Sequence, residues 1–103
     1  MVSTFEDVFS RFYLRVEDYN IVGLDEEIVN EMLYGYLKSV ISKPFVRRLF
    51  SSITVDDDVE EIEYTMRESW GSDADQDFVE ELLSMGMIVE WLNPRYNSMQ
   101  NTS

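Results

Sequence analysis

Residues 25–41, DEEIVNEMLYGYLKSVI, contain the most regular pattern in this chain, and the expected fold is built outward from them. Apolar side chains recur at helical spacing over about four turns, from Ile28 and Val29 to Val40 and Ile41. Asp25 precedes the pattern and can cap its first turn. Pro44 follows it and disfavours a helical residue immediately before it. The stretch therefore predicts a capped helix with one broad buried face.

Three further helices are predicted from the same spacing. The first covers about residues 4–16, with Thr4 as its cap, and the segment DYNIVG at 18–23 ends it. In the second, Asp56 or Asp57 is expected to cap a helix whose inward face carries the apolar residues Val59, Ile62, Met66 and Trp70. The tripeptide ITV at 53–55 is too short to predict a strand by itself.

The last helix is expected over about residues 76–92, with Pro94 ending it. Its main apolar stripe comprises Phe78, Leu82, Met85, Val89 and Leu92, widened by Leu83, Met87, Ile88 and Trp91. Because it is the most apolar element, it should lie at the centre of the fold. The predicted fold is all-α: a bundle of about four helices in residues 1–93, followed by an extended C-terminal tail in residues 94–103.

The composition narrows the function classes. With 103 residues, the chain is expected to form one domain that buries about two thirds of its unfolded surface. It has no cysteine and no histidine, which removes thiolate nucleophiles and the usual zinc ligands. With 21 acidic and 8 basic residues, the net charge is −13, and binding to duplex DNA through a basic face is not expected.

No motif predicts a catalytic or metal site. Asp73, Asp75 and Asp77 match the first three ligands of an EF-hand loop, but Phe78 replaces the required glycine and Ser84 the required glutamate. The serines have no histidine to activate them. The chain is therefore expected to be no enzyme and to have no cofactor. No signal peptide and no membrane span are predicted.

Half of the basic residues lie close together between positions 38 and 48. This basic patch comprises Lys38, Lys43, Arg47 and Arg48. It either compensates a helix dipole or docks an acidic neighbour, which could be another copy of the chain. The acidic face that could meet it comprises Asp56, Asp57, Asp58, Glu60 and Glu61. Contacts between opposite charges on one chain favour a ring or a filament.

The C-terminal run MGMIVEWLNPRYNSMQNTS, residues 85–103, resembles the end of the helical domain in small virion proteins of tailed bacteriophages. These are the head-to-tail connectors, also described as adaptors, neck proteins or head-completion proteins. The resemblance lies in the VEWL stretch at 89–92, the proline-containing turn at 93–94 and the tail at 98–102. It covers about a fifth of the chain.

The resemblance implies a structural protein of the virion neck, made in the cytoplasm of the bacterial host. Copies would form a ring, commonly of about twelve, beneath the portal and link the capsid to the tail. The partners would be the portal protein, other neck and tail proteins and the chain itself, while DNA passes through an acidic channel without being gripped. The residues implied in portal or subunit binding are Trp91, Asn93, Pro94, Arg95, Tyr96, Met99 and Asn101.

Two alternatives belong to other classes. An acidic inhibitor that mimics DNA would account for the charge, but a mimic needs acids spread along an elongated face. Here the acids cluster at the predicted starts of helices. A small regulatory adaptor that binds a partner helix is the second alternative.

Overall fold

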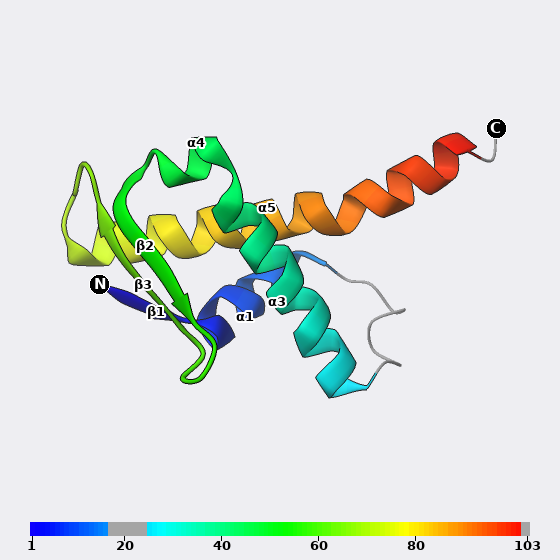
Figure 1. Cartoon of the computed structure of the whole chain (residues 1–103), viewed down its shortest axis with the longest axis horizontal. Coiled ribbons are helices and arrows are strands. Elements are labelled where there is room, and N and C mark those ends of the chain that lie inside the picture. The colour runs from blue at the N-terminus through cyan, green and yellow to red at the C-terminus, as the bar shows by residue number, and fades with distance from the viewer. Residues whose placement is uncertain (17–24, 102–103) are drawn as a thin grey trace.

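The computed structural model describes residues 1–16 and 25–101, with side chains described up to Asn93, so the predicted break at 18–23 lies outside the described residues. In chain order the elements are β1 (Val2–Thr4), α1 (Phe5–Arg15), α3 (Glu26–Ser42), α4 (Pro44–Arg47), β2 (Phe50–Asp56), β3 (Glu61–Met66) and α5 (Ser72–Asn101). The strands form one antiparallel sheet in the order β1-β3-β2 (Figure 1). The prediction of an all-α fold is therefore wrong, because the fold is mixed α and β.

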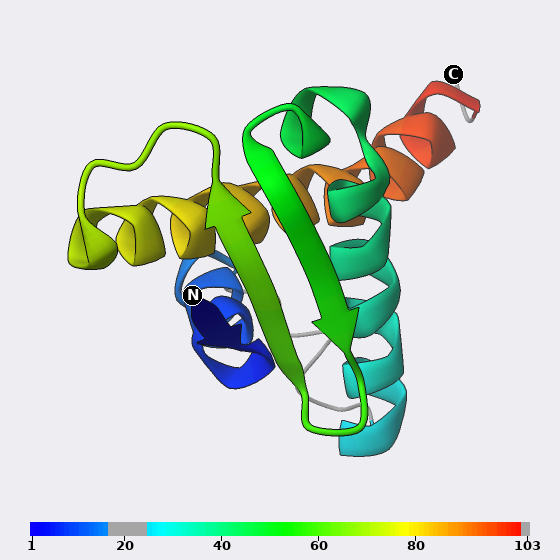
Figure 2. The ribbon, with the colours of Figure 1, turned by 60° about the vertical axis from the view of Figure 1, so that its left-hand side comes forward.

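The helix predicted to begin at Asp56 or Asp57 does not form. This segment belongs instead to a β-hairpin made by β2 and β3, which Figure 2 shows side by side. Ile62 and Tyr64 on β3 are buried, whereas Glu63 between them is exposed, so the side chains alternate with the period of a strand. Val59 and Trp70, which the helix would have buried, are exposed. The sequence pattern predicted a helix because Ile62 fits the period of a helix as well as that of a strand.

The acidic residues at the start of the predicted helix form the turn of the hairpin. Asp56 Oδ1 accepts a hydrogen bond from the backbone N–H of Asp58 at 3.0 Å, which closes a tight turn instead of capping a helix. Glu60 ends the turn with φ of 55°, and its carbonyl accepts from the N–H of Phe5 at 3.0 Å. The hairpin turn is thereby fixed to the first residue of α1.

The helices α1 and α3 confirm the predicted caps. The Thr4 hydroxyl accepts from the N–H of Asp7, and the Asp25 carboxylate accepts from the N–H of Glu27. The helix α3 ends at Ser42, and Pro44 then begins the short helix α4. Of the stripe predicted for α3, Ile28 alone is exposed.

The last helix is longer than predicted. The helix α5 continues through Pro94 to Asn101, so the expected turn and extended tail are wrong for this part of the chain. Proline has no N–H to donate, so the carbonyl of Glu90 loses its usual partner in the helix. In Figure 1 the C-terminal end of α5 reaches beyond the other elements.

The core lies between the sheet and the helices. As predicted, α5 is central, because it contacts both α1 and α3. Its buried apolar face, however, comprises Val79, Leu83 and Met87, whereas Met85, Val89 and Leu92 of the predicted stripe are exposed. At Gly86 an added Cβ would lie 2.6 Å from Val40 Cγ1, so α3 and α5 pack closely there because residue 86 has no side chain.

Candidate functional site

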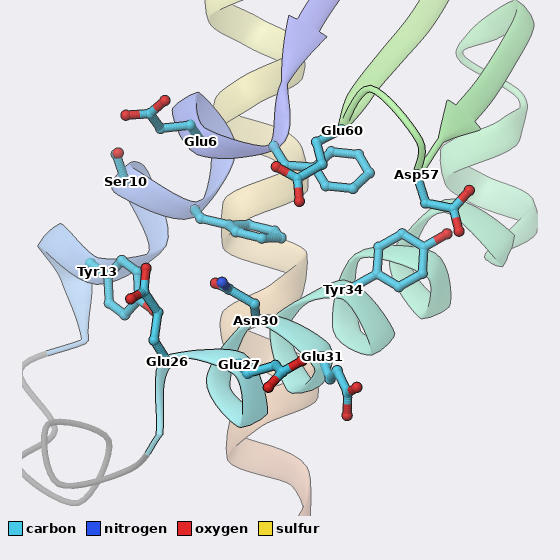
Figure 3. Close-up of a pocket in the computed structure, with 12 residues that line it drawn as sticks. Glu6, Ser10, Tyr13, Glu26, Glu27, Asn30, Glu31, Tyr34, Asp57 and Glu60 are labelled. Atoms are coloured by element: carbon cyan, nitrogen blue, oxygen red, sulfur yellow. The ribbon is translucent and has the colours of Figure 1, made fainter.

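An acidic groove lies where three elements meet, between α1, the first half of α3 and the hairpin turn (Figure 3). Its volume is about 630 Å³. The carboxylates that line it are Glu6, Glu26, Glu27, Glu31, Asp57 and Glu60. None of them forms an ion pair with a described residue. The groove therefore carries uncompensated negative charge.

Aromatic rings line the same groove. Phe5 lies with its ring centroid 5.8 Å from that of Phe9 and 5.5 Å from that of Tyr34. Tyr13 is 43% exposed on the α1 side. Partial burial, followed by the charge of Glu26, raises the pKa of Tyr13, so its ring stays neutral in the physiological range.

Carboxylates around aromatic faces are suited to organic cations. A guanidinium or ammonium group can pair with the acids and lie over a ring. In the described part of the chain, no cluster of three or more acids is placed to hold a metal ion. Because of its carboxylates and rings, the groove is a candidate site for basic side chains.

The predicted basic patch divides into two parts. Lys38 lies over the ring of Tyr34, 5.1 Å from its centroid, and Lys43 pairs with Glu90 at 3.3 Å. These two lysines are used within the chain. Arg47 and Arg48 are exposed and form no ion pair among the described residues. They form the available part of the patch.

The groove and these arginines lie at opposite ends of α3. The acids Glu26, Glu27 and Glu31 stand in its first turns, whereas α4 follows its last residue. A helix of 17 residues spans about 25 Å at 1.5 Å per residue. The molecule therefore has an acidic end and a basic end. The acids 56–58, 60 and 61 of the predicted acidic face lie in or beside the hairpin turn at the acidic end.

A second charged cluster joins α1 to α5. Arg11 pairs with Asp77 at 2.8 Å and with Glu81 at 3.1 Å. Arg15 Nη1 donates to Glu81 at 2.9 Å. The hydrogen bond from Arg15, supported by that from Arg11, lowers the pKa of Glu81 below its usual range. Arg11 also lies 3.5 Å from Glu80, so both arginines are paired within the chain and the cluster joins two helices.

Replacing Glu81 with glutamine should reduce stability at pH 7 but not in acid. Because the folded-state pKa of Glu81 is lowered, its stabilising effect is present above the unfolded pKa and disappears as pH falls through the folded value. The difference in unfolding free energy between wild type and Glu81→Gln should therefore vanish as the pH falls below the folded-state pKa of Glu81. Urea titrations at several pH values measure it. Glu68→Gln, which removes an exposed carboxylate, should match wild type throughout; a difference for Glu81→Gln that persists in acid would contradict this pairing.

A hydroxyl–carboxylate cluster lies inside the fold. Ser3 Oγ is 2.9 Å from Tyr64 Oη and 2.9 Å from Glu80 Oε2. Ser3, Tyr64 and Glu80 are all buried, which denies a substrate access to the hydroxyls. Burial also raises the pKa of Tyr64. The cluster satisfies polar groups that connect β1, β3 and α5, and its role is structural.

The EF-hand-like aspartates also have structural roles. Asp75 is buried and accepts hydrogen bonds from Ser69 Oγ and from the N–H of Trp70 at 2.9 Å. Asp77 pairs with Arg11, and Asp73 stays exposed in the first turn of α5. Asp75 therefore closes the loop that enters α5.

The residues implied in portal binding fall on the second half of α5. Trp91 is half-buried, with its ring edge-to-face with Phe12 at 6.3 Å, so it contributes to the core. Asn93 is exposed. The side chains of Pro94, Arg95, Tyr96, Met99 and Asn101 lie outside those described, and their role stays a prediction.

Sequence reasoning missed most of the groove. It proposed Asp57 and Glu60, but it did not bring in Glu6, the acids of the first turns of α3, or the four aromatic residues. The available signal was the placement of acids at the starts of helices. The fold brings the first turns of α1 and α3 to the same groove as the hairpin turn, which the sequence pattern does not encode.

No protein-family model matches this chain, and comparisons with curated proteins and with solved structures find no match either. Among the described residues, no helix is long and apolar enough to cross a membrane.

Proposed function

We propose that this chain is a non-enzymatic assembly protein whose copies join head to tail, the basic end of one against the acidic end of the next. The observation that carries the proposal is the separation of unpaired charge along α3. The two surfaces differ in sign and lie on opposite ends. Such a contact is heterologous and continues into a ring or a filament.

The assembly proposed is the head-to-tail connector of a tailed bacteriophage, a ring beneath the portal. The resemblance of residues 85–103 to that family supports it, together with the acidic composition. Because α5 is helical to Asn101, the portal contact is proposed for the projecting end of this helix. The contact between one copy and the next is called the joint. Acids outside it, including Glu63, Glu68 and Asp73, stay exposed and repel DNA phosphates.

This arrangement favours self-assembly over the two alternatives. The groove acids have a matching basic surface in the exposed arginines beyond the other end of α3, whereas a DNA mimic needs no such basic surface. A regulatory adaptor would need no basic patch that matches its own acidic groove.

Analytical ultracentrifugation tests the proposal on the wild-type chain. In about 50 mM salt the protein should form species larger than a dimer, which dissociate toward monomer near 1 M salt because exposed charges are then screened beyond about 3 Å. Added portal protein should co-sediment with the assembly. A monomer at every concentration and at low salt would contradict head-to-tail assembly; assembly without portal binding would contradict only the connector role.

A further inference from the structure

The short helix α4 carries an exposed aromatic side chain. Phe45 is 64% exposed and stands beside the available basic patch formed by Arg47 and Arg48. A large aromatic ring in water forgoes the burial that normally stabilises it. Its neighbour Val46 points inward and is buried, which fixes α4 on the body and leaves Phe45 outward.

The acidic groove could bury the exposed ring of Phe45. Its walls include Phe5, Phe9, Tyr13 and Tyr34, and its rim is made of carboxylates (Figure 3). An aromatic side chain flanked by guanidinium groups matches an aromatic pocket flanked by carboxylates, both in apolar area and in charge. The volume of about 630 Å³ leaves room for a phenyl ring together with an arginine side chain.

We infer that Phe45 of one copy inserts into the acidic groove of the next copy, with Arg47 and Arg48 pairing to the carboxylates at its rim. This inference rests on the proposed head-to-tail function and names the residue that anchors it. The occupant is a second copy of this chain, since α4 supplies both the apolar and the cationic half of the complement.

The same molecule cannot fill its own groove with α4. Three of the six groove acids stand in the first turns of α3, and α4 begins only after this helix of 17 residues has ended. Val46 is buried and holds α4 in place at that end. The insertion therefore has to occur between copies, and each joint combines a groove from one copy with an anchor from another.

The joint has two components with different responses to salt. The arginine–carboxylate pairs lie at the rim, where salt screens them. The buried ring contributes through its apolar area, which salt does not screen. Loss of Phe45 should therefore weaken association at both low and moderate salt.

Sedimentation equilibrium of Phe45→Ala tests the anchor. The dissociation constant should rise by at least about 30-fold, as expected for truncation of an aromatic anchor at the centre of an interface. Phe45→Tyr should associate nearly as wild type does. Met85→Ala, which removes an exposed apolar side chain of α5 outside both surfaces, is the matched control and should change nothing.

A double-mutant cycle with Tyr13→Ala tests the contact itself. If the two rings meet across the joint, the double variant should bind no more than a few-fold weaker than Phe45→Ala alone, because the second truncation removes a contact already lost. Circular dichroism checks that all variants fold. If wild type assembles and Phe45→Ala assembles equally well, this inference is overturned while the proposed function stands. If wild type stays monomeric, the proposed function is overturned and the inference that rests on it is overturned with it.

Discussion

Gly86→Ala should lower the free energy of unfolding by about 2 kcal/mol, although alanine favours helices over glycine by nearly 1 kcal/mol. The added Cβ would lie 2.6 Å from Val40 Cγ1 and 2.9 Å from Val40 Cγ2, well inside van der Waals contact. Because both methyl groups of Val40 lie within 3.0 Å, every staggered rotamer of Val40 leaves at least one methyl group in a clashing position. The helices α3 and α5 must move apart, which loosens the centre of the core.

A matched control lies on α3. Gly35 has nothing within 4 Å of an added Cβ, so Gly35→Ala should stabilise the protein by up to about 1 kcal/mol. Adding Val40→Ala to Gly86→Ala should restore part of the lost stability, because it removes the obstructing methyl groups. Urea denaturation measures all of these variants. If Gly86→Ala proves as stable as Gly35→Ala, the close packing of α3 on α5 described above is incorrect.

Replacement of both Arg47 and Arg48 by alanine should weaken self-association by about 100-fold, which corresponds to about 2.7 kcal/mol. In the proposed joint these arginines are the cations that meet the groove carboxylates, so their loss leaves the carboxylates without a cationic partner. Stability should change little, since both side chains are exposed and make no ion pair with a described residue. Light scattering at low salt measures the association.

A control must separate the effect of the net charge on association from the effect of where the charges lie. The variant Arg47→Ala/Arg48→Ala loses two positive charges, which changes the net charge from −13 to −15. Ser72→Glu/Ala74→Glu adds two negative charges in the exposed first turn of α5 and also gives −15. This control should assemble nearly as wild type does. Equal loss in both variants would show that general repulsion, and not the basic patch, sets the association.

The parts of the fold that sequence predicted are those decided by local chemistry. Thr4 and Asp25 cap α1 and α3 as expected, and Pro44 follows the end of α3. Each signal involves a side chain and a backbone group within a few residues. The β-hairpin was missed because its strands pair residues up to 16 positions apart, from Asp56 with Glu61 to Phe50 with Met66, and because Ile62 falls on both the helical and the strand pattern.

The buried face of α5 was misjudged for a different reason. Asp75, Glu80 and Ser84 are buried on α5 together with Val79 and Leu83, which makes the true inner face look polar in the sequence. Their hydrogen-bond partners include side chains from β1 and from the loop before the helix, so the polarity is satisfied only once the chain has folded. The outer stripe with Met85 and Val89 consequently appeared to be the apolar side.

The candidate site was partly predictable. The basic segment and the acids of the hairpin turn were identified as complementary surfaces from charge alone. The groove depends on α1, the first half of α3 and the hairpin turn coming together, which no local pattern encodes. Likewise, Lys38 and Lys43 were included in the patch because their internal partners, Tyr34 and Glu90, could not be assigned from charge spacing.

The most direct test of head-to-tail assembly is a mixing experiment between two variants that each retain one surface. One carries Arg47→Ala/Arg48→Ala and keeps the groove; the other carries Glu26→Gln/Glu27→Gln/Glu31→Gln and keeps the patch. Sedimentation should show that each is a monomer alone and that an equimolar mixture forms a one-to-one complex and nothing larger, because only one intact joint is possible. Two folded variants that stay monomeric when mixed, at a concentration where wild type assembles, would contradict the head-to-tail joint.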